Sequence, residues 1–274
     1  MTIVAISREM GSGGYEIGAA VAKALGFEYV NRQILLEAVH ASGVPEATLD
    51  HVVAHRPSVW ERFDAERRRY LTFLEAAYYT FAARDNLVTA SRSGPFFVRD
   101  VQHALKVRIM APVEIRVRRV MVEHQLDHKA AAAKVHAYDR EMAGRLDYLF
   151  GVDWSRPEHY DLVLNTQDDA WDFYTDFLVT AARHPRYQAT PDSVRRLHDL
   201  YLTAQVRAAL ATDPGTQNLS LEVAAQAGCV GLTGVVFSPA VLQTAAAVAA
   251  RVPGVTRVSC EQVETSGPYF GPIM

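Results

Sequence analysis

A glycine-rich turn near the N-terminus constrains the fold of this chain most strongly. Gly11-Ser-Gly-Gly14 separates a short, apolar, β-branched segment, residues 2–6, from a helical pattern over residues 15–25. A second short strand is expected at residues 27–30, and this strand–turn–helix–strand order is typical of a βαβ unit. Glycines before a helix let backbone N–H groups approach an anion, but a tight turn that needs positive φ requires them too. The turn therefore predicts either a phosphate-binding loop or a purely structural βα turn.

The rest of the N-terminal part alternates strands with helices. Further strands are expected at residues 86–90, 104–110 and 160–164, and helices at residues 32–41, 59–84, 113–126, 128–149 and 170–182. Such alternation favours a mostly parallel sheet with helices on both faces. We therefore expect an α/β domain over residues 1–184.

The pattern changes at residues 184–192, which contain Pro185 and Pro191 and show no periodicity, so we interpret them as a linker. Beyond the linker, the expected elements are a helix, two strands, a helix and a strand, at residues 194–210, 219–225, 229–237, 239–252 and 255–263. This α-β-β-α-β order predicts a small α+β domain over residues 192–265. The remaining residues, 266–274, are expected to form a flexible tail.

Composition excludes several classes of protein. Of the 274 residues, 49% are hydrophobic and 22% charged, which argues against a disordered chain. The net charge of −3 argues against a protein that coats nucleic acid through bulk charge. No apolar run approaches the roughly 20 residues of a transmembrane helix, and Arg8 and Glu9 interrupt the region where a signal peptide is apolar. The two cysteines are too few for a disulfide scaffold, so we expect a cytoplasmic protein.

The glycine turn differs from a standard P-loop at two positions. Such a loop has Lys and then Ser or Thr directly after its last glycine, and these places hold Gly14 and Tyr15 here. The lysine normally touches the β- and γ-phosphates, and the hydroxyl binds magnesium. Arg8 stands just before the turn and is a candidate cation from the other side. Tyr15 either stacks on a base or covers the start of the helix.

The motif Ile6-Ser-Arg-Glu-Met-Gly-Ser-Gly-Gly14, followed by Phe27-Glu-Tyr-Val-Asn-Arg-Gln-Ile-Leu35, resembles the cytidylate kinase-like family, a divergent branch of the nucleoside monophosphate kinases. Other matching segments are residues 107–112, 116–119, 139–140, 145, 151–154 and 160–166. The resemblance covers nearly all of residues 1–183 and implies the parallel sheet of the P-loop kinases. Members of this branch share a loop without the lysine. Position 15 is usually basic among them, and Tyr15 departs from that.

The resemblance implies phosphoryl transfer from ATP, with Mg²⁺, to a pyrimidine monophosphate such as CMP or dCMP. This reaction depends mainly on charge neutralisation, and the planar Arg side chain binds phosphate oxygens in pairs. Candidate catalytic residues are Arg8, Arg116, Arg119, Arg140 and Arg145. Candidate residues for the nucleotide are Gly11, Ser12, Gly13, Gly14, Tyr15 and Glu16. Candidate residues for the acceptor are Arg32, Arg92 and Asp139, and no residue is assigned to a resident metal.

Two features of the candidate site leave alternatives open. Arg92 matches the arginine that binds the acceptor phosphate in ordinary CMP kinases, but Ser91 and Ser93 flank it where those enzymes have Gly and Asp. Asp139 is a candidate for magnesium binding or for pairing with an arginine. Any single candidate arginine alternatively forms a surface ion pair, which contributes little energy.

Residues 192–264 resemble the BON domain through Gly228-Cys-Val-Gly-Leu-Thr-Gly234 and residues 245–258. BON domains are linked to phospholipids or small ligands, but this segment has no lysine and no basic cluster for anionic lipid. We therefore favour regulation, ligand sensing or self-association into a homo-oligomer over membrane attachment. The alternatives to a kinase are a nucleotide-binding sensor that has lost turnover and an adaptor that acts through this domain on a small ligand or phospholipid.

Overall fold

The computed structural model describes residues 2–41, 60–84 and 86–265. Packing divides the chain into two units. Unit 1 comprises Met1–Ala38 and Arg84–Ser193, and unit 2 comprises Val39–Ala83 and Val194–Met274. Unit 2 therefore combines the C-terminal residues with a segment from the N-terminal half of the sequence. The expected flexible tail, residues 266–274, lies outside the described residues.

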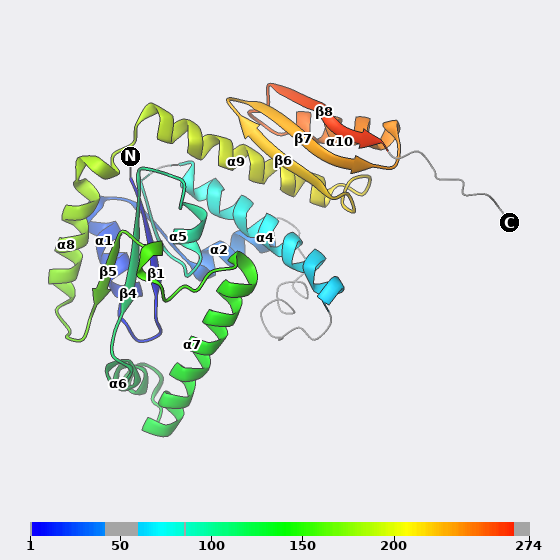
Figure 1. The fold of residues 1–274 in the computed structure, drawn as a ribbon. Helices are drawn as coiled ribbons and strands as arrows, with labels where there is room; N and C mark the ends of the chain where they lie inside the picture. The colour runs from blue at the N-terminus through cyan, green and yellow to red at the C-terminus, as the bar shows by residue number, and fades with distance from the viewer. Residues whose placement is uncertain (1, 42–59, 85, 266–274) are drawn as a thin grey trace. The chain divides into compact units, whose positions relative to one another are not determined.

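The centre of unit 1 is a five-stranded, all-parallel sheet with the strand order β2-β3-β1-β4-β5 (Figure 1). The strands are β1 (Ile3–Arg8), β2 (Glu28–Asn31), β3 (Leu87–Ala90), β4 (Ala104–Met110) and β5 (Leu162–Asn165). The expected α/β architecture is confirmed. β1 runs past its expected end at residue 6 and includes Arg8, because its last residues continue to pair with β4.

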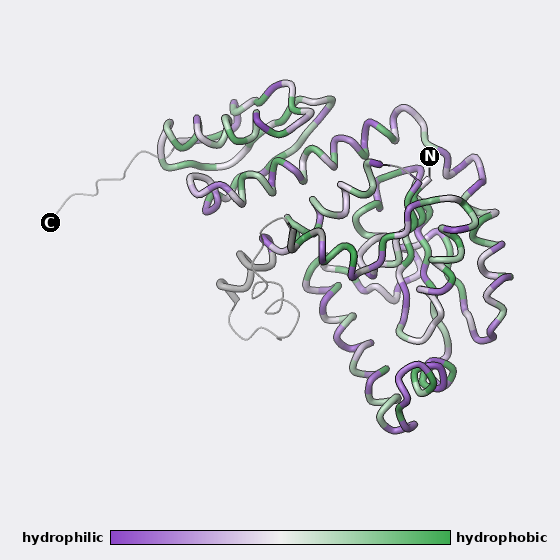
Figure 2. Tube along the Cα trace, turned by 180° about the vertical axis from the view of Figure 1, so that it is seen from behind, coloured by the Kyte–Doolittle hydropathy of each residue, from purple (hydrophilic) through white to green (hydrophobic). Residues whose placement is uncertain are grey.

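Helices cover both faces of this sheet. They are α1 (Gly14–Leu25), α2 (Arg32–Ala41), α5 (Gly94–Phe97), α6 (Val113–His124), α7 (His128–Phe150) and α8 (Trp171–Arg183), with 3₁₀ turns η1 (Pro157–His159) and η2 (Pro185–Tyr187). On one face, Ile6, Ile17 and Leu178 join β1, α1 and α8 in one buried cluster. A second cluster joins Phe96 of α5 to Met142 of α7. In Figure 2 the strands are mostly coloured hydrophobic, as their burial requires.

Unit 2 contains a mixed sheet in which β7 pairs antiparallel with β6 and parallel with β8. Its elements are α4 (Trp60–Ala82), α9 (Pro191–Thr212), β6 (Leu221–Gln226), β7 (Cys229–Val236), α10 (Pro239–Ala250) and β8 (Arg257–Thr265). Val206, Val230 and Ala245 belong to its buried core, which joins α9, the sheet and α10. The predicted α-β-β-α-β order of the C-terminal part is confirmed.

Helix α4 belongs to unit 2 by packing, although the sequence places it between β2 and β3. The Nε2 of Gln205 on α9 donates a hydrogen bond to the main-chain oxygen of Ala76 on α4, at 3.0 Å. Arg207 on α9 pairs with Glu75 on α4 at 3.5 Å and also donates to the main-chain oxygen of Val223 on β6, at 3.2 Å. The side chain of Arg207 therefore links α4 to the C-terminal sheet.

Within residues 2–41, 60–84 and 86–265, no helix is both long enough and apolar enough to span a membrane.

Candidate nucleotide site

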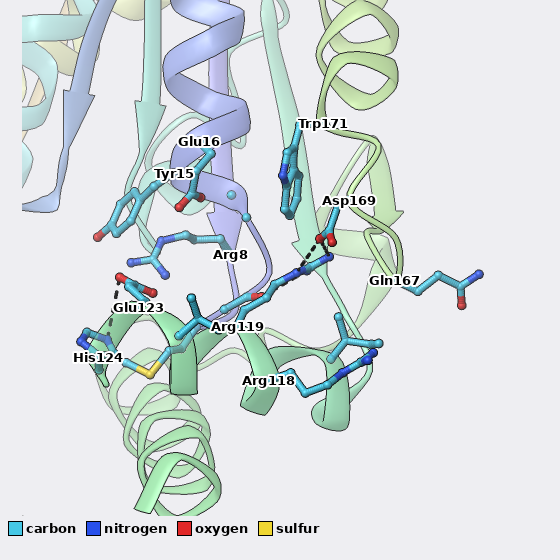
Figure 3. Close-up of a pocket in the computed structure, with 16 residues that line it drawn as sticks. Arg8, Tyr15, Glu16, Arg118, Arg119, Glu123, His124, Gln167, Asp169 and Trp171 are labelled. Carbon is cyan, nitrogen blue, oxygen red and sulfur yellow. Dashed lines mark hydrogen bonds and ion pairs between the residues drawn. The ribbon is translucent and has the colours of Figure 1, made fainter. Parts of the chain in front are cut away.

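A cavity of about 690 Å³ lies where the carboxyl end of β1 meets the start of α1. Three segments of unit 1 line it, namely the turn between β1 and α1, one side of α6, and the loop between β5 and α8 (Figure 3). Its charged lining residues are Arg8, Glu16, Arg118, Arg119, Glu123 and Asp169, and His124 also lines it. A crevice at the carboxyl ends of parallel strands is the usual ligand site of an open α/β sheet.

The backbone of the glycine turn requires glycine at two positions. Gly11 has a φ of +72° and Gly13 a φ of +76°, which are left-handed values that glycine adopts without strain. A Cβ atom on Gly11 would lie 2.7 Å from the main-chain oxygen of Arg116, and one on Gly13 would lie 2.1 Å from Cζ3 of Trp171. The glycines are therefore explained by close packing alone, and an anion-binding role needs separate support.

Ser12 uses its hydroxyl inside the turn. Its Oγ donates to the main-chain oxygen of Glu9 at 2.8 Å, and the residue is fully buried. The main-chain oxygen of Ser12 accepts a hydrogen bond from Oγ1 of Thr166 at 2.6 Å, which ties the turn to the end of β5. The Ser12 side chain therefore shapes the loop and does not face the cavity.

Arg8 and Tyr15 form a cation–π pair at the edge of the cavity (Figure 3). The guanidinium carbon of Arg8 lies 3.4 Å from the centroid of the Tyr15 ring. Among the described residues, no carboxylate lies within ion-pair distance of Arg8, and its Nε is buried without a hydrogen-bond partner. The phenol of Tyr29 donates to the main-chain oxygen of Tyr15 at 3.2 Å, and burial raises the pKa of Tyr29 to about 12. Arg8 is thus a partly buried cation with no direct carboxylate partner among the described residues.

Arg119 joins the three segments that line the cavity. It donates to the main-chain oxygens of Gly11 at 3.2 Å and Thr166 at 2.8 Å, and it pairs with Asp169 at 2.9 Å. Its guanidinium also lies 4.6 Å from the centroid of the Trp171 ring. Arg119 therefore fixes the relative positions of the glycine turn, α6 and the β5–α8 loop.

A buried charge network lies behind the turn. Glu9 is 8% exposed and accepts from Nη2 of Arg108 at 2.8 Å, while its other oxygen lies 3.3 Å from Nε of Arg116. Arg116 also donates to both carboxylate oxygens of Asp139, at 2.9 and 2.7 Å. Although burial acts in the opposite direction, the hydrogen bond to Asp139 and the charge of Glu9 raise the pKa of Arg116. Arg116 and Asp139 do not line the cavity, and their pairing joins α6 to α7.

Arg92, Arg140 and Arg145 are not among the described residues that line the cavity. On α7, Arg140 is exposed, and Arg145 pairs with Glu141 at 2.7 Å. Arg92 lies with its guanidinium 5.2 Å from the centroid of the Tyr138 ring. The backbone of Arg32 starts α2, and its side chain is not among those described.

Of the predicted site residues, the structure brings Arg8, Arg119 and the glycine turn together with Tyr15 and Glu16. Trp171 and Gln167, which follow β5 and line the cavity, were not among the predicted site residues. A polar run directly after a parallel strand, such as residues 166–169, is a signal that could have indicated them. Among the described residues, no group of three His, Cys, Asp or Glu side chains is arranged to bind a metal ion.

Comparison with known families shows to which family the chain belongs. Residues 3–168 match the model of the cytidylate kinase-like family, and this match spans more than half of the chain. The chain belongs to the cytidylate kinase-like family. Residues 198–263 match the BON domain, so a BON domain follows the kinase-like domain. The two expected resemblances are confirmed, and the parallel sheet of unit 1 is that of the P-loop kinases. The exact domain limits at residues 184 and 192 stay a prediction.

Individual relatives are distant. A cytidylate kinase of Halobacterium salinarum is 24% identical over 191 residues, which cover 69% of this chain and 93% of that protein. A uronate isomerase of Corynebacterium glutamicum is 32% identical over 98 residues, which cover 36% of this chain and only 19% of that enzyme. A shikimate kinase from Acinetobacter baumannii has 16% identity and a TM-score of 0.40, covering 66% of this chain and 93% of that one.

Proposed function

We propose that this cytidylate kinase-like chain binds ATP at the glycine turn and transfers its γ-phosphoryl group to a pyrimidine nucleoside monophosphate such as CMP or dCMP. In this reaction an oxygen of the acceptor phosphate bonds to the γ-phosphorus, and the bond to the β–γ bridging oxygen breaks, so that ADP leaves. The observation that carries the proposal is that Arg8, which has no direct carboxylate partner among the described residues, lines the same cavity as the start of α1. The first N–H groups of a helix lack partners within the helix and favour anions.

The cations of the cavity suit a polyphosphate. Arg8 and the exposed Arg118 both line it, and among the described residues neither has a carboxylate partner. Arg119 adds a third guanidinium, although its donors already bind the loop. Guanidinium groups neutralise the charge that spreads over phosphate oxygens during transfer, which is the main demand of this chemistry.

We assign Arg116 and Asp139 a positioning role. Because they pair with each other and with Glu9, they set the angle at which α6 presents Arg118 and Arg119 to the cavity. Arg140 and Arg145 stay candidates for contact with the transferring group, because both lie on α7, which follows α6 in the chain.

We assign the acceptor phosphate to Arg92 together with Arg32. Arg92 follows β3, the strand next to β1, at the same carboxyl edge of the sheet. Replacement of Arg92 by alanine is expected to raise the KM for the acceptor at least about tenfold with little change in the KM for ATP, since a charge-assisted phosphate contact contributes roughly 1.5–3 kcal/mol. An unchanged acceptor KM would remove this assignment.

The second candidate function is a nucleotide-binding sensor without turnover. The observation that favours it is the commitment of Arg119 to four protein oxygens and of Asp139 to Arg116, which leaves few free groups for catalysis. A coupled assay of ADP release with ATP and CMP, dCMP, UMP or purine monophosphates separates the two. Acceptor-dependent ADP release supports the kinase. Nucleotide binding without ADP release from any acceptor supports the sensor.

We further propose that the BON domain has a regulatory or ligand-sensing role, exerted in the cytoplasm through α4. The contacts of Gln205 and Arg207 with α4 support this, because the chain passes from α4 directly into β3 and then to Arg92. A small ligand or phospholipid, or a second copy of the chain, is the proposed partner of this domain.

A further inference from the structure

Arg8 occupies a position that a standard P-loop gives to glycine. In the pattern G-x-x-x-x-G-K-[ST], the second glycine aligns with Gly13, so the first glycine falls at position 8, the lysine at position 14 and the hydroxyl at position 15. This chain has Arg8, Gly14 and Tyr15 at those positions. The large cationic residue and the small residue have therefore exchanged places.

The structure gives a steric reason for the exchange. A Cβ atom on Gly14 would lie 2.6 Å from Cβ and 3.1 Å from Cδ of Arg8, so the Arg8 side chain fills the space that a residue at position 14 would need. A Cβ contact below 3.0 Å with the rigid first carbon of a side chain cannot be relieved without a backbone shift. An arginine at position 8 and a lysine at position 14 thus exclude each other.

The Arg8 charge remains available to a ligand. Its neighbours are the Tyr15 ring at 3.4 Å and the main-chain oxygen of Glu9 at 3.5 Å, which is a long hydrogen bond. Figure 3 shows the Arg8 side chain passing below the first turn of α1 toward Tyr15. An aromatic ring holds a guanidinium in place but leaves its in-plane N–H donors free for phosphate oxygens.

The same residues do not suit the magnesium ion that the family implies. Magnesium requires oxygen ligands in near-octahedral geometry. The Ser12 hydroxyl is committed to Glu9, and position 15 carries an aromatic ring under a cation instead of a small hydroxyl side chain. Of the carboxylates in the cavity lining, Asp169 is paired with Arg119, while Glu16 and Glu123 come from separate helices.

We infer that Arg8 replaces the P-loop lysine as the phosphate-binding cation, and that the loop binds a nucleoside polyphosphate without a magnesium ligand of its own. This inference rests on the proposed nucleotide binding, but it makes a separate statement about charge and metal. The Arg8–Tyr15 pair takes the place of the lysine–hydroxyl pair, so affinity for the polyphosphate becomes independent of magnesium.

The test is calorimetric titration of ATP into the full-length protein, once with EDTA and once with MgCl₂. The expected dissociation constants in the two buffers agree within about threefold. R8G, and R8Q as a variant of similar size in case R8G folds poorly, are expected to weaken binding about tenfold or more, because a charged phosphate contact is lost. G14K alone is expected to weaken binding as well, because the new side chain collides with Arg8.

The double variant R8G and G14K tests whether Arg8 has taken over the role of the P-loop lysine. R8G combined with G14K restores the standard arrangement and is expected to recover most of the affinity. Addition of Y15S to that pair is expected to make binding stronger with MgCl₂ than with EDTA. R186A, on the exposed turn η2, is the matched arginine control and is expected to bind ATP as the natural protein does.

Three outcomes would overturn the inference. Binding of ATP by the natural protein only with MgCl₂ would refute the statement on the metal. Natural affinity in R8G and R8Q would refute the role of Arg8. A folded natural protein that binds no ATP in either buffer would refute the proposed function itself, so the two failures are distinguishable.

Discussion

Arg116 on α6 and Asp139 on α7 form a two-fold hydrogen-bonded ion pair, with N–O distances of 2.9 and 2.7 Å. The guanidinium is 4% exposed and the carboxylate 29%. This pair fixes the hairpin of two helices that carries Arg118 and Arg119 to the nucleotide cavity. Because removal of Asp139 takes two charged hydrogen bonds from a buried guanidinium that keeps only Glu9 as a carboxylate partner, its effect should exceed that of a surface pair.

The first prediction concerns this pair. D139A is expected to lower the free energy of unfolding by about 1.5–3 kcal/mol, since buried Arg116 then loses two charged hydrogen bonds and keeps only Glu9 as a carboxylate partner. Urea unfolding measures the change. E261A, which removes the partner of Arg257 from an ion pair with both side chains exposed, is the surface-pair control, with an expected cost of about 0–1 kcal/mol. Equal costs for the two variants would show that the Asp139 pair behaves as a surface pair.

The second prediction separates backbone strain from close packing in the glycine turn. Gly13 and Gly26 both have left-handed φ values, +76° and +70°, but a Cβ on Gly26 would meet nothing within 4 Å. G26A is therefore expected to cost only the strain of about 1 kcal/mol. G13A adds a collision with Trp171 and is expected to cost more and to change the tryptophan fluorescence. Identical unfolding curves for the two variants would contradict the packing of Trp171 on Gly13.

The third prediction concerns pH. His103 is fully buried, both of its ring nitrogens lack hydrogen-bond partners among the described residues, and burial lowers its pKa below the usual 6.5. The unfolded chain therefore binds a proton more readily than the folded one, and stability falls as pH drops from about 7 through 6.5 toward the lowered pKa. Urea midpoints at pH 7.5 and 5.5 measure this loss, which H103L is expected to reduce. An identical pH dependence in H103L would refute the assignment.

The fourth prediction concerns the packing of α4 in unit 2. Q205L removes the hydrogen bonds to Ala76 and Thr80, both 3.0 Å long, and is expected to speed amide hydrogen exchange in α4 by about fivefold to tenfold, since a net hydrogen bond contributes roughly 1 kcal/mol. Exchange in α1 should not change. Q262L on the exposed part of β8 is the control for the substitution itself. If exchange in α4 is the same in both variants, Gln205 does not secure this helix.

Much of the fold could be predicted from the sequence, because burial imposes a pattern on each element. Strands such as β1 and β4 are mostly apolar and contain several β-branched residues, since helices cover both of their faces. The place of α4 could not be predicted in this way. Its apolar residues show that one face is buried, but periodicity does not identify the helix that covers that face.

Only part of the site could be predicted, again because a sequence pattern does not identify partners that are distant in the chain. The glycine turn and Arg8 adjoin each other in sequence, so their proximity followed from local structure. Whether an arginine faces a ligand or a carboxylate depends on residues distant in the chain. Arg116 meets Asp139, 23 residues away, and Arg119 meets Asp169, 50 residues away. No sequence spacing distinguishes these two from Arg118, which has no carboxylate partner in the described part of the chain.

The most direct test of the account is a crystal structure of the full-length protein grown with ATP. In that structure, β- or γ-phosphate oxygens are expected within hydrogen-bond distance of the Arg8 guanidinium and of the backbone N–H groups at the start of α1. A triphosphate bound elsewhere, with Arg8 still unliganded beside Tyr15, would contradict it.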